Sequence, residues 1–94
     1  MFTISDLKKD GKYRVEFRYP ADADHRVMLA GSFNDWAQVP MTRDENGDYV
    51  VSVKLDPGYY EYRFVVDDVW LSDESNPAFS ANDFGTLNSI LRID

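Results

Sequence analysis

Three stretches of this chain carry apolar residues at every second position, and this pattern limits the fold more than any other feature of the sequence. From Lys12 to Tyr19, aromatic and aliphatic residues take every second position, with arginine or glutamate between them. The same period of two recurs from Tyr49 to Leu55 and from Tyr59 to Val66. Successive side chains of a strand point to opposite faces, so each stretch predicts a strand with one buried face.

Turn residues separate these stretches. Asn46-Gly47 is a strong hairpin signal, and Asp56-Pro57-Gly58 and Asp67-Asp68 are further turns. Shorter strands are expected at four other places, residues 26–30, 41–42, 69–71 and 87–93. The polar segment 72–83 is expected to be a long loop. About seven short strands with turns roughly every eight to twelve residues predict an all-β antiparallel β-sandwich.

The length of 94 residues predicts one domain, and a hydrophobic content of 44% is enough for a packed core. Residues 1–11 are expected to be the least firmly held. The chain has no cysteine, and its first residues contain no apolar run of signal-peptide length. We therefore expect a cytoplasmic protein without disulfides, and no segment long enough to span a membrane.

The formal net charge of −7 bears on the class of ligand. A negative surface repels phosphate backbones and anionic lipids, so neither nucleic acid nor a membrane is an expected partner. A neutral glycan is not affected by this charge.

No residue pattern predicts a catalytic or metal site, and no cofactor is expected. Asp44-x-Asn46-x-Asp48 resembles the start of a calcium loop, but Tyr49 and Leu55 stand where that loop needs glycine and glutamate. His25 has no nucleophile or metal ligand at a recognisable spacing. The acidic residues around Trp70 lie in turns, where carboxylates are solvated and lack the raised pKa of a glycosidase acid. The sequence therefore predicts a protein that is not an enzyme.

Trp36 and Trp70 both lie beside turn residues, and two interpretations of them remain open. They could cap the two ends of the core. Alternatively, they could be exposed platforms on which sugar rings stack. Covering one sugar face would remove on the order of 60–80 Å² of apolar area from water, worth roughly 1.5–2 kcal/mol. Two such platforms, less the cost of association, predict a dissociation constant of roughly 10 µM to 1 mM.

The sequence also resembles a known family over residues 27–93. The matching motifs are Gly31-Ser32-Phe33-Asn34-x-Trp36, Pro40-Met41, Gly58-x-Tyr60-x-Tyr62-Arg63-Phe64-x-Val66-Asp67, Trp70 and Gly85-Thr86-x-Asn88. They are similar to carbohydrate-binding module family 48, the glycogen- and starch-binding type found in the β subunit of AMP-activated protein kinase and in isoamylase and branching-enzyme N-terminal domains. The resemblance implies an all-β, immunoglobulin-like (early-set) antiparallel β-sandwich.

The resemblance further implies five carbohydrate-binding residues: Trp36, Arg63, Trp70, Phe84 and Asn88. The two tryptophans correspond to the stacking tryptophans of the family, and Asn88 to an asparagine that bonds sugar hydroxyls. Arg63 stands where glycogen-binding members have lysine, and Phe84 where kinase members have leucine. Asp68 stands where the family turn usually has glycine.

The three binding residues other than the tryptophans also have structural interpretations. Arg63 could be a solvent-facing residue paired with Glu61 or Glu16. Phe84 could fill the core, and Asn88 could bond the local backbone.

Two functions follow. The first is a non-catalytic module that binds α-1,4-glucan such as glycogen, starch or a maltooligosaccharide, with the two tryptophans on consecutive glucose units. The alternative is a protein-interaction or scaffolding β-sandwich that meets a partner chain or a second copy of itself.

Overall fold

The computed structural model describes residues 1–7, 10–21, 24–81 and 85–94 of the chain. These residues form strands and one short 3₁₀ helix, η1 (Ser32–Asn34). The strands are β1 (Phe2–Leu7), β2 (Tyr13–Tyr19), β3 (Val27–Gly31), β4 (Val39–Pro40), β5 (Thr42–Arg43), β6 (Tyr49–Leu55), β7 (Gly58–Val66), β8 (Val69–Leu71), β9 (Phe79–Ala81) and β10 (Leu87–Ile93).

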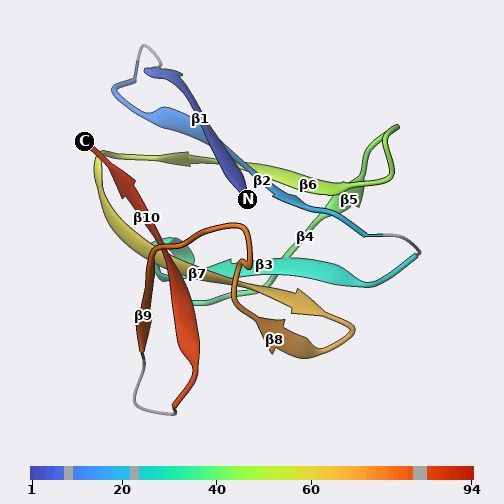
Figure 1. Cartoon of the computed structure of the whole chain (residues 1–94). Coiled ribbons are helices and arrows are strands. Elements are labelled where there is room, and N and C mark those ends of the chain that lie inside the picture. Colours follow the sequence, from blue (N-terminus) through green and yellow to red (C-terminus); the bar gives the residue numbers. More distant parts are fainter. Residues whose placement is uncertain (8–9, 22–23, 82–84) are drawn as a thin grey trace.

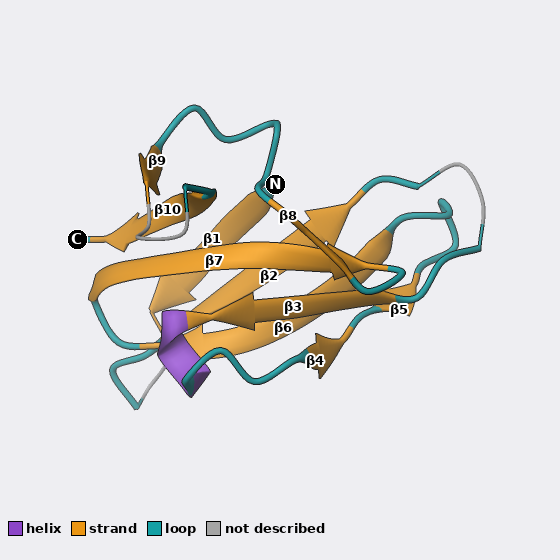
Figure 2. Cartoon of the chain, turned by 90° about the horizontal axis from the view of Figure 1, so that it is seen from below, coloured by secondary structure: helices purple, strands orange, loops and turns teal. Residues whose placement is uncertain are grey.

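The strands make two sheets, which we call sheet A and sheet B (Figure 1). Sheet A has the order β1-β2-β6-β5, and sheet B has the order β4-β3-β7-β10-β9, with β8 paired to the far half of β7. All strand pairs are antiparallel. Seen from below, β3 and β7 of sheet B lie over β2 and β6 of sheet A (Figure 2). The prediction of an all-β, immunoglobulin-like antiparallel β-sandwich is confirmed.

The core lies between the sheets and is built from the apolar positions of the alternating strands. On sheet A, Val15 and Phe17 are fully buried, and on sheet B Tyr62 and Leu91 are fully buried. The rings of Phe17 and Tyr62 meet across the core edge to face, with centroids 4.9 Å apart. Burying a large apolar side chain stabilises the fold by about 1.5–3 kcal/mol, so this layer holds the two sheets together.

Three strands were not predicted from the sequence. β1 pairs with β2 along the N-terminal segment, with a break in register between Ile4 and Leu7. β4 pairs with β3 where no strand was expected, and β9 lies within the predicted loop and pairs with the first residues of β10. All three are edge strands, and strands as short as β4 and β9 cannot show a period. Their pairing depends on the neighbouring strand more than on their own sequence.

The turn at Asp67 and Asp68 connects β7 to β8 and has the predicted position. Both aspartates have left-handed backbone angles, with φ of 49° and 69°. Two successive positive φ values match the right-handed twist of a two-residue hairpin, and aspartate adopts them more readily than most residues. The turn therefore brings Trp70 back along the second half of β7.

Candidate functional site

The outer face of sheet B, which points away from the core, carries most of the predicted binding residues. On β7, Tyr62, Phe64 and Val66 are buried, so the alternate residues Tyr59, Glu61, Arg63 and Val65 belong to the outer face. On β10, Ser89 and Leu91 are buried opposite Tyr62 and Tyr60, so the outer positions are Asn88, Ile90 and Arg92. Alternation on two neighbouring strands thus places Arg63 and Asn88 on one surface.

Trp70 belongs to the same face, because it lies directly opposite Val65 in the pairing of β7 with β8. Arg63 contacts it in two ways. Its guanidinium carbon lies 5.7 Å from the centroid of the Trp70 ring, and its Nη2 donates a hydrogen bond of 2.9 Å to the Trp70 carbonyl. The predicted pairing of Arg63 with Glu61 or Glu16 is not among the contacts of the described residues, and Glu16 instead pairs with Arg18.

Trp36 comes from the loop that follows η1. The Trp36 amide donates to the Gly31 carbonyl at 2.9 Å and closes the turn at the end of the helix. Asp35 and Trp36 both have left-handed backbone angles, with φ of 57° and 63°. A bulky residue seldom adopts this conformation, which costs roughly 1–2 kcal/mol. The strained turn brings the Trp36 ring to within 6.5 Å of the Trp70 ring, centroid to centroid, with 49° between the ring planes.

The two rings are half-buried and lie outside the core. Neither belongs to the buried cluster between the sheets or to the partly buried apolar residues that pack against it. Val65 and Ala30 point by register to the outer face, yet both are buried, so side chains of this face cover them. The tryptophans therefore belong to a small apolar layer on the outside of sheet B, with part of each indole left accessible.

Asn88 is linked to the same face by Glu61, a residue that sequence analysis did not select. The Asn88 Nδ2 donates to Glu61 Oε1 at 3.2 Å, and the Glu61 amide donates to Ser32 Oγ at 3.0 Å. The Tyr59 hydroxyl lies 3.4 Å from Glu61 Oε2, and burial together with this carboxylate raises the pKa of Tyr59. The period of two on β7, which puts Glu61 on the face of Arg63, is the signal that could have selected it.

Phe84, the fifth predicted residue, lies outside the described residues. The structure therefore brings together Trp36, Arg63 and Trp70, with Asn88 joined to them through the strand that carries Glu61 and Arg63. Whether these residues bind sugar stays a prediction.

In the turn that resembles a calcium loop, Asp44 and Asp48 bind the side chain of Arg18. Arg18 Nη1 donates to Asp44 Oδ2 at 2.7 Å and to Asp48 Oδ2 at 2.9 Å. The other carboxylate oxygen of Asp44 accepts the amides of Asn46 and Asp48. These interactions occupy the oxygen atoms a cation would need, and the ion pair with Arg18 holds the pKa of Asp44 below its ordinary value. In the described part of the chain, no group of three or more potential ligands could hold a metal ion.

His25 pairs with a single carboxylate. Its Nδ1 lies 2.8 Å from Asp67 Oδ2, and the other oxygen of Asp67 accepts the Arg26 amide at 2.9 Å. The contacts of Asp67 with His25 and Arg26 connect the β7–β8 turn to the residues just before β3.

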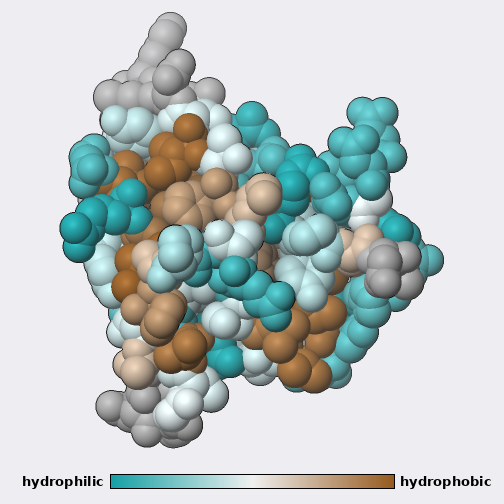
Figure 3. All heavy atoms as spheres, in the orientation of Figure 1, coloured by the Kyte–Doolittle hydropathy of each residue, from teal (hydrophilic) through white to brown (hydrophobic). Residues whose placement is uncertain are grey.

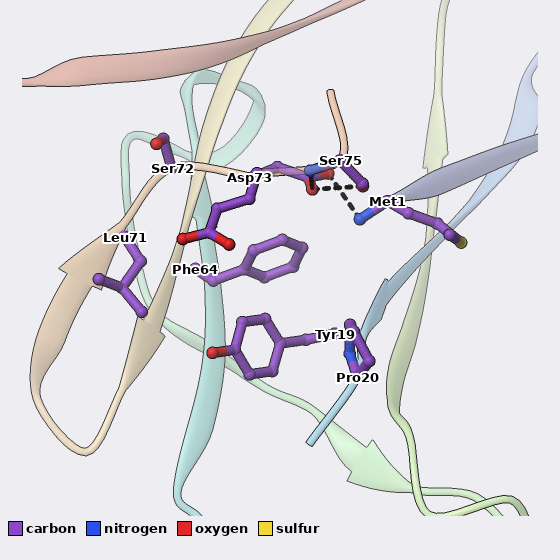
Figure 4. A pocket seen from close by; sticks show the side chains of 9 residues that line it. Met1, Tyr19, Pro20, Phe64, Leu71, Ser72, Asp73 and Ser75 are labelled. Carbon is purple, nitrogen blue, oxygen red and sulfur yellow. Dashed lines mark hydrogen bonds and ion pairs between the residues drawn. The ribbon is translucent and has the colours of Figure 1, made fainter. Parts of the chain in front are cut away.

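A cavity of about 410 Å³ opens beside Met1, and neither tryptophan lines it (Figure 4). Tyr19, Phe64 and Leu71 form its apolar side, and Asp73 and Ser75 its polar side. The Asp73 carboxylate is held by the Tyr62 hydroxyl at 2.6 Å, by Ser75 and by the Met1 ammonium. Because these donors satisfy the carboxylate, it serves the fold and is not free to bind a ligand.

Exposed apolar residues are scattered over the surface. Figure 3 shows separate hydrophobic patches among hydrophilic residues on one face of the molecule. The most exposed large apolar residues are Met1, Ile4, Tyr59, Val69, Phe79 and Leu87. Within the described residues, no helix is long and apolar enough to cross a membrane.

The sequence matches known proteins over most of its length. The sequence model of the family described as the glycogen recognition site of AMP-activated protein kinase matches residues 13–94. The chain is 39% identical over 67 residues to the β-1 subunit of 5'-AMP-activated protein kinase from Sus scrofa, a match that covers 71% of this chain and 53% of that sequence. It is 41% identical over 68 residues to the protein FLOURY ENDOSPERM 6, chloroplastic, of Oryza sativa, covering 71% of this chain and 12% of that protein.

A solved structure shares the fold. The maltogenic amylase from S. marinus superposes on the whole chain with a TM-score of 0.77 at 23% sequence identity, and the match covers 16% of the amylase. The kinase subunit of Rattus norvegicus is matched over 24% of its length. The chain thus corresponds to about half or less of each of these proteins.

Proposed function

The chain belongs to the family of the glycogen recognition site of AMP-activated protein kinase, and we propose that it binds α-1,4-glucan by stacking two consecutive glucose units on Trp36 and Trp70. The family is described as a recognition site, which agrees with the prediction that the chain is a module without catalytic activity. One observation carries the proposal: two half-buried indoles lie side by side on the outer face of sheet B, outside the core.

The geometry of the two rings suits a curved chain of sugars. Their planes are inclined by 49°, and consecutive glucose units of an α-1,4-glucan also turn relative to one another. Each indole offers an apolar surface to the C–H face of one ring, worth roughly 1.5–2 kcal/mol per ring. After the cost of association, this contribution supports a dissociation constant of roughly 10 µM to 1 mM.

Arg63 and Asn88 supply hydrogen bonds in this proposal. Only one hydrogen bond of the Arg63 guanidinium is with a described residue, the carbonyl of Trp70, and its buried Nε has no partner within the described residues. The guanidinium therefore retains donors for sugar hydroxyls beside the indole that it contacts. Asn88 is almost fully buried and its nitrogen bonds Glu61, so its amide oxygen is the atom proposed to accept from a sugar hydroxyl.

Affinity electrophoresis in gels containing glycogen or amylopectin tests the proposal, with calorimetry on β-cyclodextrin as the quantitative measurement. We expect the wild-type chain to be retarded, and Trp36→Ala and Trp70→Ala to lose the retardation. Phe79→Ala is the matched control, because Phe79 is an exposed aromatic residue of sheet B that pairs with the inward-facing Ser89. A folded wild-type sample that binds none of these glucans would refute the proposal.

The alternative, a protein-interaction sandwich, is favoured by a different observation. β9 is an edge strand of sheet B, and its Phe79 and the neighbouring Leu87 are exposed apolar residues. An edge strand with apolar side chains can pair with another polypeptide. Sedimentation of the pure chain tests self-association through this edge, which Phe79→Lys should abolish.

The expected cytoplasmic location stays a prediction, since one relative is named as chloroplastic.

A further inference from the structure

The outer face of sheet B continues past Asn88 to a third aromatic residue, Tyr59, which is more exposed than the two tryptophans. Tyr59, Glu61 and Arg63 occupy alternate positions of β7 and therefore point to the same side of the sheet. Tyr59 is 48% exposed, whereas Tyr62 on the opposite face of the same strand is fully buried. An aromatic ring that the core does not use is thus present on the face that carries the tryptophan pair.

Tyr59 has a cationic neighbour on the adjacent strand. Arg92 lies directly opposite Tyr59 in the pairing of β10 with β7. The Arg92 guanidinium carbon lies 5.9 Å from the centroid of the Tyr59 ring. At the other end of β7, Arg63 lies over Trp70 at 5.7 Å. The same pairing of an aromatic ring and a guanidinium therefore occurs twice on this face.

Hydrogen bonds through Glu61 link Tyr59 to Asn88 in the middle of this face. Glu61 lies between them, with Oε1 accepting from Asn88 and Oε2 within 3.4 Å of the Tyr59 hydroxyl. Tyr59 and Arg63 are four positions apart along the strand, a distance of roughly 13 Å. This distance is greater than one sugar ring spans, so a ligand touching both ends must contain several units.

We propose that Tyr59 and Arg92 form an additional glucan subsite, which binds a sugar unit of the same chain beyond those on Trp36 and Trp70. The proposal rests on the proposed function, because it extends that surface. The Tyr59 ring offers an apolar face to the sugar, and the Arg92 guanidinium offers donors to its hydroxyls. Glu61, between the two ends, offers carboxylate oxygens to hydroxyls of the intervening unit.

The subsite has a measurable consequence in the dependence of affinity on chain length. A short oligosaccharide reaches only one end of the face, whereas a long one can contact both ends. Affinity should therefore increase from maltotriose to maltoheptaose, and the increase should depend on Tyr59. Tyr59→Ala should lower the affinity for maltoheptaose about fivefold to tenfold, with a smaller loss for maltotriose.

Calorimetry with maltotriose, maltopentaose and maltoheptaose tests this proposal on the wild-type chain, on Tyr59→Ala and on three further variants. Tyr59→Phe keeps the ring and removes only the hydroxyl contact with Glu61, so it should retain most of the gain with length. Trp70→Ala should lower the affinity for every oligosaccharide. Phe79→Ala truncates an exposed aromatic residue on the other face and should behave as the wild type. Thermal unfolding of each variant confirms that the fold is intact.

The outcomes separate the two proposals. If the wild-type chain binds and Tyr59→Ala loses the gain with length, the additional subsite is supported. If the wild-type chain binds but Tyr59→Ala keeps that gain, or affinity does not rise with length at all, the subsite is wrong and the tryptophan site stands. If no oligosaccharide or polysaccharide binds, both proposals fail together.

Discussion

Arg63 is bound to Trp70 at two points, through the indole ring and through the main-chain carbonyl. The carbonyl bond fixes the guanidinium, and the ring contact restricts the indole. Both residues are positioned by the pairing of β7 with β8 that follows the Asp67-Asp68 turn. One platform of the proposed site is therefore held by a charged residue that itself has donors for sugar.

Replacing Arg63 tests this relationship. Arg63→Ala should lower glucan affinity about tenfold, because it removes sugar hydrogen bonds and lets the Trp70 indole move. Arg63→Lys keeps the charge and should lose less, although lysine has no planar group to lie over the indole. Calorimetry with β-cyclodextrin measures both effects. Equal affinity of Arg63→Ala and the wild type would show that Arg63 neither binds sugar nor positions Trp70.

The left-handed backbone of Trp36 gives a second prediction, which separates fold from binding. The free energy of unfolding of Trp36→Gly should be about 0.5–1 kcal/mol higher than that of Trp36→Ala, because glycine adopts a φ of 63° without strain. Both variants should lose glucan retardation, since both lack the ring. Urea unfolding of the two variants gives the comparison. Trp36→Ala being the more stable would mean that the turn rearranges when the indole is removed.

Gly31 supports the loop that carries Trp36. A Cβ added at this position would collide with the ring of Phe33, which is packed against Phe17 and Tyr60. Gly31→Ala should therefore destabilise the fold by about 1–3 kcal/mol and also weaken glucan binding by displacing the following turn. Chemical denaturation and affinity electrophoresis on the same sample measure the two effects. Gly47→Ala is a useful comparison, because its strain comes from a φ of 87° in a turn far along the sequence from Trp36.

The buried carboxylate of Asp73 predicts a dependence of stability on pH. Burial raises the pKa of Asp73, but hydrogen bonds from the Met1 ammonium, Tyr62 and Ser75 outweigh it and hold the pKa below the ordinary value of 3.8. A lowered pKa in the folded state stabilises the fold above the unfolded-state pKa, and this contribution is lost as the pH falls through the folded value. The free energy of unfolding should therefore fall on acidification below about pH 4, and fall less steeply for Asp73→Asn.

Tyr62→Phe provides a matched variant for this network. It removes the hydroxyl that donates to Asp73 and accepts from Asn76 at 3.1 Å, while keeping the buried ring. We expect a loss of about 1–3 kcal/mol at neutral pH. Denaturant titrations between about pH 3 and pH 7 measure the free energy of unfolding of Asp73→Asn and Tyr62→Phe. An Asp73→Asn variant with the same acid dependence as the wild type would assign that dependence to the exposed carboxylates.

Local pattern was sufficient to predict the long strands. β2, β6 and β7 have nearly the predicted bounds, because a period of two over seven or more residues leaves a single way to bury the apolar side. β1, β4 and β9 were not predicted, since an edge strand is defined by its partner. The sequence motifs placed Trp36, Arg63, Trp70 and Asn88 among the candidates, but Tyr59 and Glu61 occupy the unspecified positions of the motif that begins at Gly58. They were identified only when β10 was seen beside β7.

The sequence by itself therefore determined the class of fold, the strands that form the core and the family to which the chain belongs, because these depend on short-range patterns and on motifs in fixed order. Only the tertiary structure decided that the tryptophans meet. Trp36 comes from a strained turn after β3 and Trp70 from a hairpin after β7, and the pairing of β3 and β8 on either side of β7 brings them within 6.5 Å. Contacts between residues so far apart in sequence are set by sheet register, which no local pattern contains.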